Sequence, residues 1–172
     1  MIRIEVEGME EMMDALRKLG STGEKYLQKG LNEVGAEAMS EMRVNSPAIT
    51  TRLRSSIHYE SPNTNIYSYT DNQGKGYNGK FQKKASRLSV LVGSNVEYAD
   101  AVNYGTAPHV ITPKNAKALR FKVGGQFIFA TKVNHPGTKG LGFFEKGVSK
   151  GEQILEQRLR INYDKAVREI LG

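Results

Sequence analysis

A line of apolar residues at helical spacing near the C-terminus limits the possible folds of this chain more than any other feature. The line covers about 28 residues, or about 40 Å of helix, and consists of Phe144, Val148, Leu155, Leu159, Tyr163, Val167 and Leu171. A helix with one apolar face needs a covering layer. Because one small sheet does not easily cover a helix of that length, we predict that its distal half packs on another chain or lies across the subunit boundary.

The N-terminal segment alternates apolar and charged residues before it becomes helical. Residues 2–6 have the period of a strand with one buried face. Residues 9–19 then place apolar side chains at helical spacing, and Gly20 supplies a natural helix stop. We therefore predict a short strand followed by a helix.

A second, longer helix is predicted over residues 21–42. It opens with the pattern S-x-x-E from Ser21 to Glu24, which is a capping box. Pro47 limits the helix at its other end, because the residue before a proline avoids the α conformation. Several positions in this helix hold small residues, namely Gly30, Gly35, Ala36 and Ala38. Small residues can mean only that the helix propensity is weak, or that a neighbouring element approaches the helix closely. We favour close approach.

The clearest local pattern lies between residues 118 and 130. Two runs of alternating apolar and polar residues flank Gly124-Gly125, which is typical of a β-hairpin with a two-residue turn. We expect most of its large apolar side chains to lie in the core, namely Leu119, Phe121, Phe127 and Phe129. A further strand is predicted from Leu88 to Val92.

Residues 62–86 show no apolar period and are rich in Asn, Gly, Ser, Tyr and Lys. We interpret them as a flexible loop excursion within one domain that spans residues 1–172. The element order is strand, helix, helix, strands with a hairpin, and helix. The predicted fold class is therefore α+β, with a mostly antiparallel sheet flanked by two N-terminal helices and one long C-terminal helix.

Composition excludes several classes of protein. The chain has no Cys, which removes disulfides, thiolate nucleophiles and Cys-ligated zinc. No apolar run has the length of a membrane span, and the charged, alternating N-terminus does not resemble a signal peptide. Residues 42–140 hold fourteen bases and four acids. This excess suits nucleic acid or an acidic protein surface, although a solvated basic face is the simpler interpretation.

Residues with catalytic or metal-binding chemistry do not form a recognised motif. His58, His109 and His135 lie far apart in the sequence, so a metal site completed by Asp100 is a remote alternative. A hydrolase triad of Ser56, His109 and Asp100 lacks the nucleophile elbow. The glycine pattern from Gly74 to Gly79 lacks the strand and helix that a dinucleotide site needs. We predict no catalytic residue, cofactor or metal.

Several segments occur in an order that resembles the tail-completion and neck proteins of long-tailed phages. The opening IRIEVEGMEEMMDALRKLG resembles their start, and SPAITTRLRSSI is similar to their A-P-x-x-T-G-x-L-R-x-S-I stretch, with Thr51-Arg52 where Gly is usual. VGSNVEYADAVNYGT resembles V-G-x-x-x-x-Y-A-x-x-x-E-x-G-T, with Asn103 in place of Glu. HVITPKNAKALRF and NHPGTKGLGFFEKGV resemble the continuation. The resemblance covers most of the chain except residues 62–86.

The resemblance implies a structural virion protein at the head–tail joint, without catalysis. It implies a homo-oligomeric ring, by analogy a hexamer, that contacts neck, tail-terminator or tail-tube proteins. Passing DNA is a further, non-specific contact, and a basic nucleic-acid-binding protein is the alternative function. The protein would reside in the virion, and in the host cytoplasm during assembly.

Polar, aromatic and helix-face side chains are the candidate partner contacts. They are Arg52, Arg54, Tyr67, Tyr69, Tyr77, Lys80, Lys83, Lys84, Leu159, Tyr163 and Val167. Tyrosines interleaved with lysines are also the ingredients of single-strand recognition. We prefer a partner protein, because no nucleic-acid-binding fold is evident around them.

Overall fold

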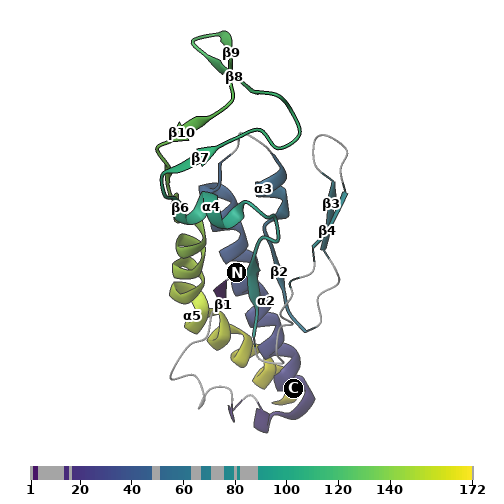
Figure 1. Cartoon of the computed structure of the whole chain (residues 1–172). Coiled ribbons are helices and arrows are strands. Elements are labelled where there is room, and N and C mark those ends of the chain that lie inside the picture. The colour runs from purple at the N-terminus through teal and green to yellow at the C-terminus, as the bar shows by residue number, and fades with distance from the viewer. Residues whose placement is uncertain are drawn as a thin grey trace. The chain divides into compact units, whose positions relative to one another are not determined.

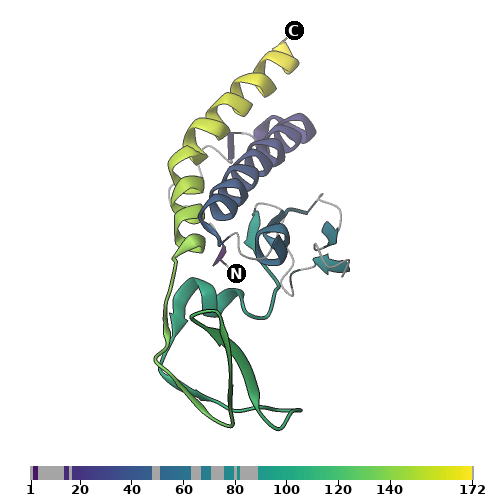
Figure 2. The same cartoon turned by 90° about the horizontal axis from the view of Figure 1, so that it is seen from above.

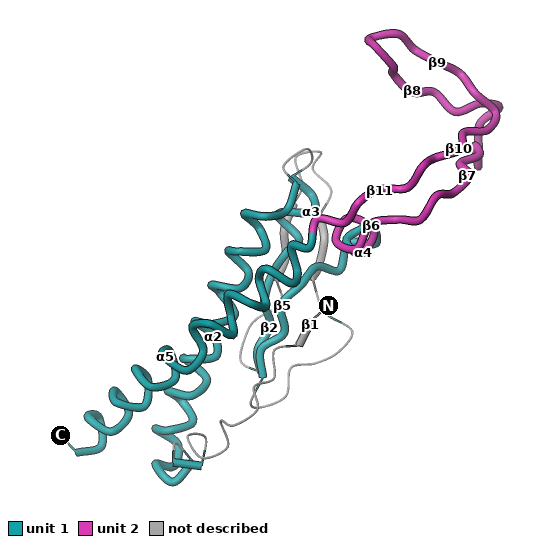
Figure 3. The backbone as a smooth tube through the Cα atoms, turned by 90° about the vertical axis from the view of Figure 1, so that its left-hand side faces the viewer, with its two compact units in different colours: residues 1–99, 142–172 teal, residues 100–141 magenta. Residues whose placement is uncertain are grey.

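The computed structural model describes residues 2–3, 14–15, 17–47, 51–62, 67–70, 76–79, 81 and 89–171. The chain divides into two compact units (Figure 3). The first unit comprises residues 1–99 and 142–172, and the second comprises residues 100–141.

Helices dominate the first unit and short strands the second (Figure 1). The described elements are, in chain order, β1 (Ile2–Arg3), α2 (Gly20–Asn45), α3 (Thr51–Ser56), β2 (His58–Glu60), β3 (Tyr67–Thr70), β4 (Gly76–Gly79), β5 (Leu91–Gly93), α4 (Ala99–Tyr104), β6 (Gly105–Thr106), β7 (His109–Ile111), β8 (Leu119–Val123), β9 (Gln126–Ala130), β10 (Val133–His135), β11 (Thr138–Lys139) and α5 (Phe143–Leu171). The mixture of helices and antiparallel strands, with a long C-terminal helix, confirms the predicted α+β class.

The two long helices α2 and α5 lie side by side and run antiparallel (Figure 2). At one end Lys25 binds Glu169, and at the other a Cβ on Gly147 would meet Met42. Their facing sides form one apolar cluster, which includes Leu27, Leu31, Val34, Leu155, Leu159 and Ala166. The apolar line of α5 is therefore largely covered by α2 of the same chain. The expectation that a second chain covers its distal half overlooked this antiparallel partner.

Glycines bring α2 close to its neighbours on two sides. A Cβ on Gly30 would lie 2.9 Å from Cδ2 of Leu159 in α5. A Cβ on Gly35 would lie 3.0 Å from Cδ2 of Tyr59 in β2 and closer still to Val90. Both distances are shorter than ordinary carbon contacts. The prediction that small residues mark close approach is confirmed at these two positions.

A three-stranded antiparallel sheet, in the order β1-β5-β2, completes the first unit. Val92 of β5 is paired with Ile2 on one side and with Tyr59 on the other. The strand predicted from Leu88 to Val92 is observed as β5 over Leu91–Gly93. All three of its residues are buried, as expected for the central strand of the sheet.

The start of α2 differs from the predicted capping box. The helix begins at Gly20, its N-cap residue is Leu19, and no side chain caps it. Gly20 has a φ of +64°, so the chain does turn at this glycine, as a helix stop requires. Ser21 consequently lies inside the first turn rather than before it and cannot act as the cap. Residues 4–13, which contain most of the predicted first helix, lie outside the described residues.

The segment expected to be an aperiodic loop contains a hairpin. Strands β3 and β4 pair antiparallel, with Ser68 opposite Asn78 and Tyr69 opposite Tyr77. Backbone pairing does not require apolar alternation, so a polar sequence concealed these strands. Phe81, also in this segment, is buried and stacks on His58 with 4.2 Å between ring centroids.

The second unit contains three nested pairs of antiparallel strands. In β6–β11 Thr106 is opposite Thr138, and in β7–β10 His109 is opposite His135. These two ladders share one register, because Thr138 lies as many residues after His135 as Thr106 lies before His109. The β8–β9 ladder, in which Leu119 is opposite Ala130, is offset from that register by five residues.

The hairpin predicted over residues 118–130 is confirmed, but the predicted burial of Phe127 and Phe129 is not. Gly124 and Gly125 form the turn with φ values of +57° and +88°, which suit a primed turn. Phe127 is 51% exposed and Phe129 is 67% exposed, so the prediction that they lie in the core is wrong. Alternation predicts a buried face only where a second layer covers the strands.

Candidate interaction surfaces

Arg52 anchors α3 to the loop that follows β5. Its guanidinium donates hydrogen bonds of 3.0 and 2.9 Å to the two carboxylate oxygens of Glu97. Its Cζ also lies 5.4 Å from the centroid of the Tyr98 ring. This candidate interface residue is thus held in place by its own chain, with only part of its side chain exposed.

Arg54 also contacts its own chain, since it donates a 2.8 Å hydrogen bond to the carbonyl oxygen of Ser46, just after α2. Among the other candidates, Tyr67, Tyr69 and Tyr77 belong to the β3–β4 hairpin. Lys80, Lys83 and Lys84 lie outside the described residues. An interface role for this region remains a prediction.

The three candidates on α5 do not share one environment. Leu159 is completely buried in the cluster with α2. Tyr163 is half-buried and packs against the edge of that cluster, and Val167 is half-buried. Since Leu159 already has its contacts within the chain, only Tyr163 and Val167 remain candidates for contact with another chain.

Charged and polar side chains close the distal end of the α2–α5 pair. Tyr26 donates a 2.6 Å hydrogen bond to Glu169, and the ammonium of Lys25 lies 3.1 Å from the same carboxylate. The hydrogen bonds from Tyr26 and Lys25 hold the pKa of the Glu169 carboxyl below its ordinary value. The Glu169 carboxylate in turn raises the pKa values of Tyr26 and Lys25, chiefly through these hydrogen bonds.

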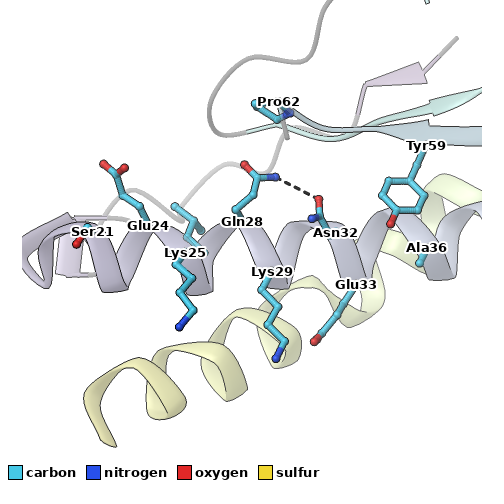
Figure 4. A pocket seen from close by; sticks show the side chains of 11 residues that line it. Ser21, Glu24, Lys25, Gln28, Lys29, Asn32, Glu33, Ala36, Tyr59 and Pro62 are labelled. Carbon is cyan, nitrogen blue, oxygen red and sulfur yellow. Dashed lines mark hydrogen bonds between the residues drawn. The ribbon is translucent and has the colours of Figure 1, made fainter. Parts of the chain in front are cut away.

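An open groove of about 770 Å³ lies beside α2 (Figure 4). Its walls include polar residues along the helix, with Tyr59 and Pro62 on the opposite side. Gln28 donates a 3.2 Å hydrogen bond to Asn32 within it. A groove with this lining offers hydrogen-bonding groups.

The three histidines fall into two separate places. His58 is buried in the first unit, where its Nδ1 lies 2.8 Å from the carbonyl oxygen of Ser56. His109 and His135 stack in the second unit with 5.0 Å between centroids. Within the described part of the chain, no three His, Asp or Glu residues gather closely enough to hold a metal.

The β8–β9 hairpin is a surface that the sequence interpretation missed. Its exposed apolar side chains are Val123, Phe127, Ile128 and Phe129. The signal was present in Phe127-Ile128-Phe129, because three consecutive apolar residues place apolar groups on both faces of one strand. A strand that is apolar on both faces, in a ladder of two strands, leaves apolar surface in solvent.

The structure defines an α+β protein with a two-helix core on a small sheet and a basic segment of three antiparallel strand pairs, residues 105–141, here called the ribbon. The family is defined by sequence: residues 10–105 match the model described as "Bacteriophage HK97-gp10, putative tail-component". The match covers more than half of the 172 residues, and the chain belongs to this family. This membership confirms the predicted resemblance to a family of phage tail proteins and supports a structural role in the virion.

Comparison with the curated proteins and with the solved structures gave no match. None of the helices in the described residues combines the length and the apolar character that crossing a bilayer requires. All of the ribbon except Gly105, and the whole of α5, lie beyond the segment that matches the family model.

Proposed function

We propose that this protein is a structural subunit of the phage head–tail joint, which acts by assembling into a ring. The observation that carries the proposal is the family match over residues 10–105. Subunits of this kind work through surfaces rather than through reactive groups. The exposed hairpin and the half-buried Tyr163 and Val167 are the surfaces that support assembly.

The partners in this proposal are other copies of the chain and neighbouring proteins of the neck, tail terminator or tail tube. A closed ring forms when one surface of a subunit binds a different surface of the next and the rotation between neighbours closes. The ring proposed here is a hexamer. The protein would assemble in the host cytoplasm and remain in the virion, without catalytic activity.

Electron microscopy of particles made without this protein tests the joining role. Separate, complete heads and tails are the expected result, and re-addition of the purified protein should restore joined particles. Joined particles in its absence would contradict the proposal. Native mass spectrometry tests the ring separately, with a hexamer as the expected species.

Nucleic-acid binding is the second candidate, favoured by the fourteen bases and four acids of residues 42–140. Residues 105–141 contain six bases and no acid. If DNA binding were the main task, affinity would depend steeply on salt through release of counterions. We expect only weak binding that disappears near physiological salt. A tight complex at that salt, lost when Lys80, Lys83 and Lys84 are replaced by Ala, would reverse the ranking.

A further inference from the structure

The β8–β9 hairpin has two unlike faces, because side chains alternate along each strand. One face, here called the apolar face, carries Leu119, Phe121, Val123, Ile128 and Ala130. The other face, here called the cationic face, carries two cross-strand pairs, namely Arg120 opposite Phe129 and Lys122 opposite Phe127. The cationic face combines two positive charges with two large, exposed rings.

The cations of this face are held over an aromatic ring rather than by an acid. The Cζ atom of Arg120 lies 3.9 Å from the centroid of Phe127, and Nζ of Lys122 lies 5.0 Å from it. Such cation–π contacts restrict the side chains without neutralising them. Residues 105–141 contain no acid, so no carboxylate of this segment pairs with the two cations. Two such faces would repel each other, so a second copy would have to offer a different, acidic surface.

A complementary surface is present on α5 of the same chain. Glu152 and Glu156 are exposed one turn apart, and within the described residues neither has an ion-pair partner. Like charges at this spacing on a helix repel each other. Tyr163 follows on the same face, seven residues after Glu156. We call Glu152 and Glu156 the acidic stripe.

The spacing of the two surfaces matches. Arg120 and Lys122 are two residues apart on a strand, which separates them by about 6.6 Å. Glu152 and Glu156 are four residues apart on a helix, which separates them by about 6 Å. Each cation of the hairpin can therefore face one carboxylate of the stripe. Phe127 and Phe129, on the adjoining strand, would then lie along the helix beside the acids.

We propose that the cationic face of the hairpin in one copy docks on the acidic stripe of α5 in a neighbouring copy. The inference rests on the proposed function in one respect, namely that copies of the chain assemble. It adds which two surfaces meet and makes the contact heterologous, with a different patch on each side, as ring closure requires.

Cross-linking between two single-cysteine proteins tests the contact, because the natural chain has no Cys. One protein carries Gln126→Cys at the tip of the hairpin, and the other carries Ser149→Cys, one turn before Glu152; both positions are exposed. The two are mixed and treated with a short bis-maleimide. We expect a covalent heterodimer. A contact within one chain cannot produce it, since each chain has only one thiol.

The matched control replaces Ser149→Cys with Ser40→Cys, an exposed serine on α2. This control should give little heterodimer. Reversal of both acids, Glu152→Lys with Glu156→Lys, should lower the yield about tenfold. When the Gln126→Cys protein also carries Arg120→Glu and Lys122→Glu, the yield of heterodimer should be restored. Circular dichroism on every variant verifies that the helices are intact.

Absence of the heterodimer, or equal yield with the Ser40→Cys control, would overturn the docking proposal. Failure of the reversed charges to restore the yield would overturn it as well. These results are separable from the proposed function. Rings that form without this cross-link refute the docking alone, whereas joined heads and tails in particles without the protein refute the joining role.

Discussion

The carbonyl oxygen of Ala38 in α2 lies 2.8 Å from the point at which a Cβ atom on Gly147 of α5 would stand. That distance is too short for a carbon and a backbone oxygen, and a backbone atom cannot step aside as a flexible side chain can. Gly147 thus sets how closely the two long helices approach. Met42, on the same side of α2, would meet the added methyl group as well.

Gly147→Ala should therefore destabilise the protein by about 1–3 kcal/mol through overpacking. The better helix propensity of Ala, worth about 1 kcal/mol, offsets only part of this loss. Urea unfolding followed by circular dichroism measures the difference. Gln157→Ala, at an exposed position on the same helix, is the control and should change stability little. Equal stability of both variants would show that the helices separate easily.

Leu159→Ala should lower the free energy of unfolding by about 2–5 kcal/mol, because it leaves a cavity in the cluster between α2 and α5. Val167→Asp, at a half-buried position, should leave the helices folded. Thermal unfolding distinguishes the two. If Val167→Asp also abolishes oligomers seen by native mass spectrometry, the distal part of α5 lies in an interface. Full stability of Leu159→Ala would contradict its place in the core.

The cluster of Lys25, Tyr26 and Glu169 should make stability depend on pH at both extremes. The pKa of Glu169 is lower in the folded state than its ordinary 4.5, so its contribution is present above that value and is lost as pH falls through the folded pKa. The pKa values of Tyr26 and Lys25 are raised from 10.0 and 10.5, so their contributions are present below those values and are lost in strong alkali.

Glu169→Gln should remove much of the acid part of this dependence. The stability difference between the natural protein and the variant should be largest near neutral pH and should shrink below about 4.5. Urea unfolding across the pH range measures it. A difference that stays constant from neutral to acid pH would mean that the carboxylate is not held by Tyr26 and Lys25.

The two glycines in the turn of the β8–β9 hairpin should differ in the substitutions that they tolerate. Gly124→Asn keeps a residue type that accepts the φ of +57° and favours the turn, whereas Gly125→Ala places a Cβ at a φ of +88°. We expect Gly125→Ala to destabilise the hairpin by about 1–2 kcal/mol. Amide hydrogen exchange of residues 119–130 reports on pairing. Similar exchange in the two variants would exclude this turn geometry.

The sequence was informative wherever the local pattern alone determines the structure. The hairpin follows from two alternating runs around Gly124-Gly125, and α5 follows from its apolar period. Gly30 and Gly35 also indicated close packing correctly, because a missing side chain has a simple steric meaning. In each case a few neighbouring residues contain the whole signal.

The errors concern what covers a surface. The apolar line of α5 showed that Leu159 needs a partner, but not that the partner is α2 rather than another chain. The alternating pattern predicts a core position for Phe127 and Phe129, because alternation usually accompanies a covering layer. The pattern does not say whether that layer exists. Among the candidate contacts, Arg52 and Arg54 proved to be tied to Glu97 and Ser46. Charge alone does not reveal such partners.

The pairing of α2 with α5 also has a consequence for how the protein is made. The start of α5 at Phe143 comes 98 residues after the end of α2 at Asn45. At ordinary rates of translation, a ribosome needs about 5–20 s to add that much chain. For this interval α2 is synthesised but lacks the helix that covers Leu27 and Leu31. The nascent chain therefore exposes an apolar helix face, which is the kind of surface that chaperones bind until synthesis is complete.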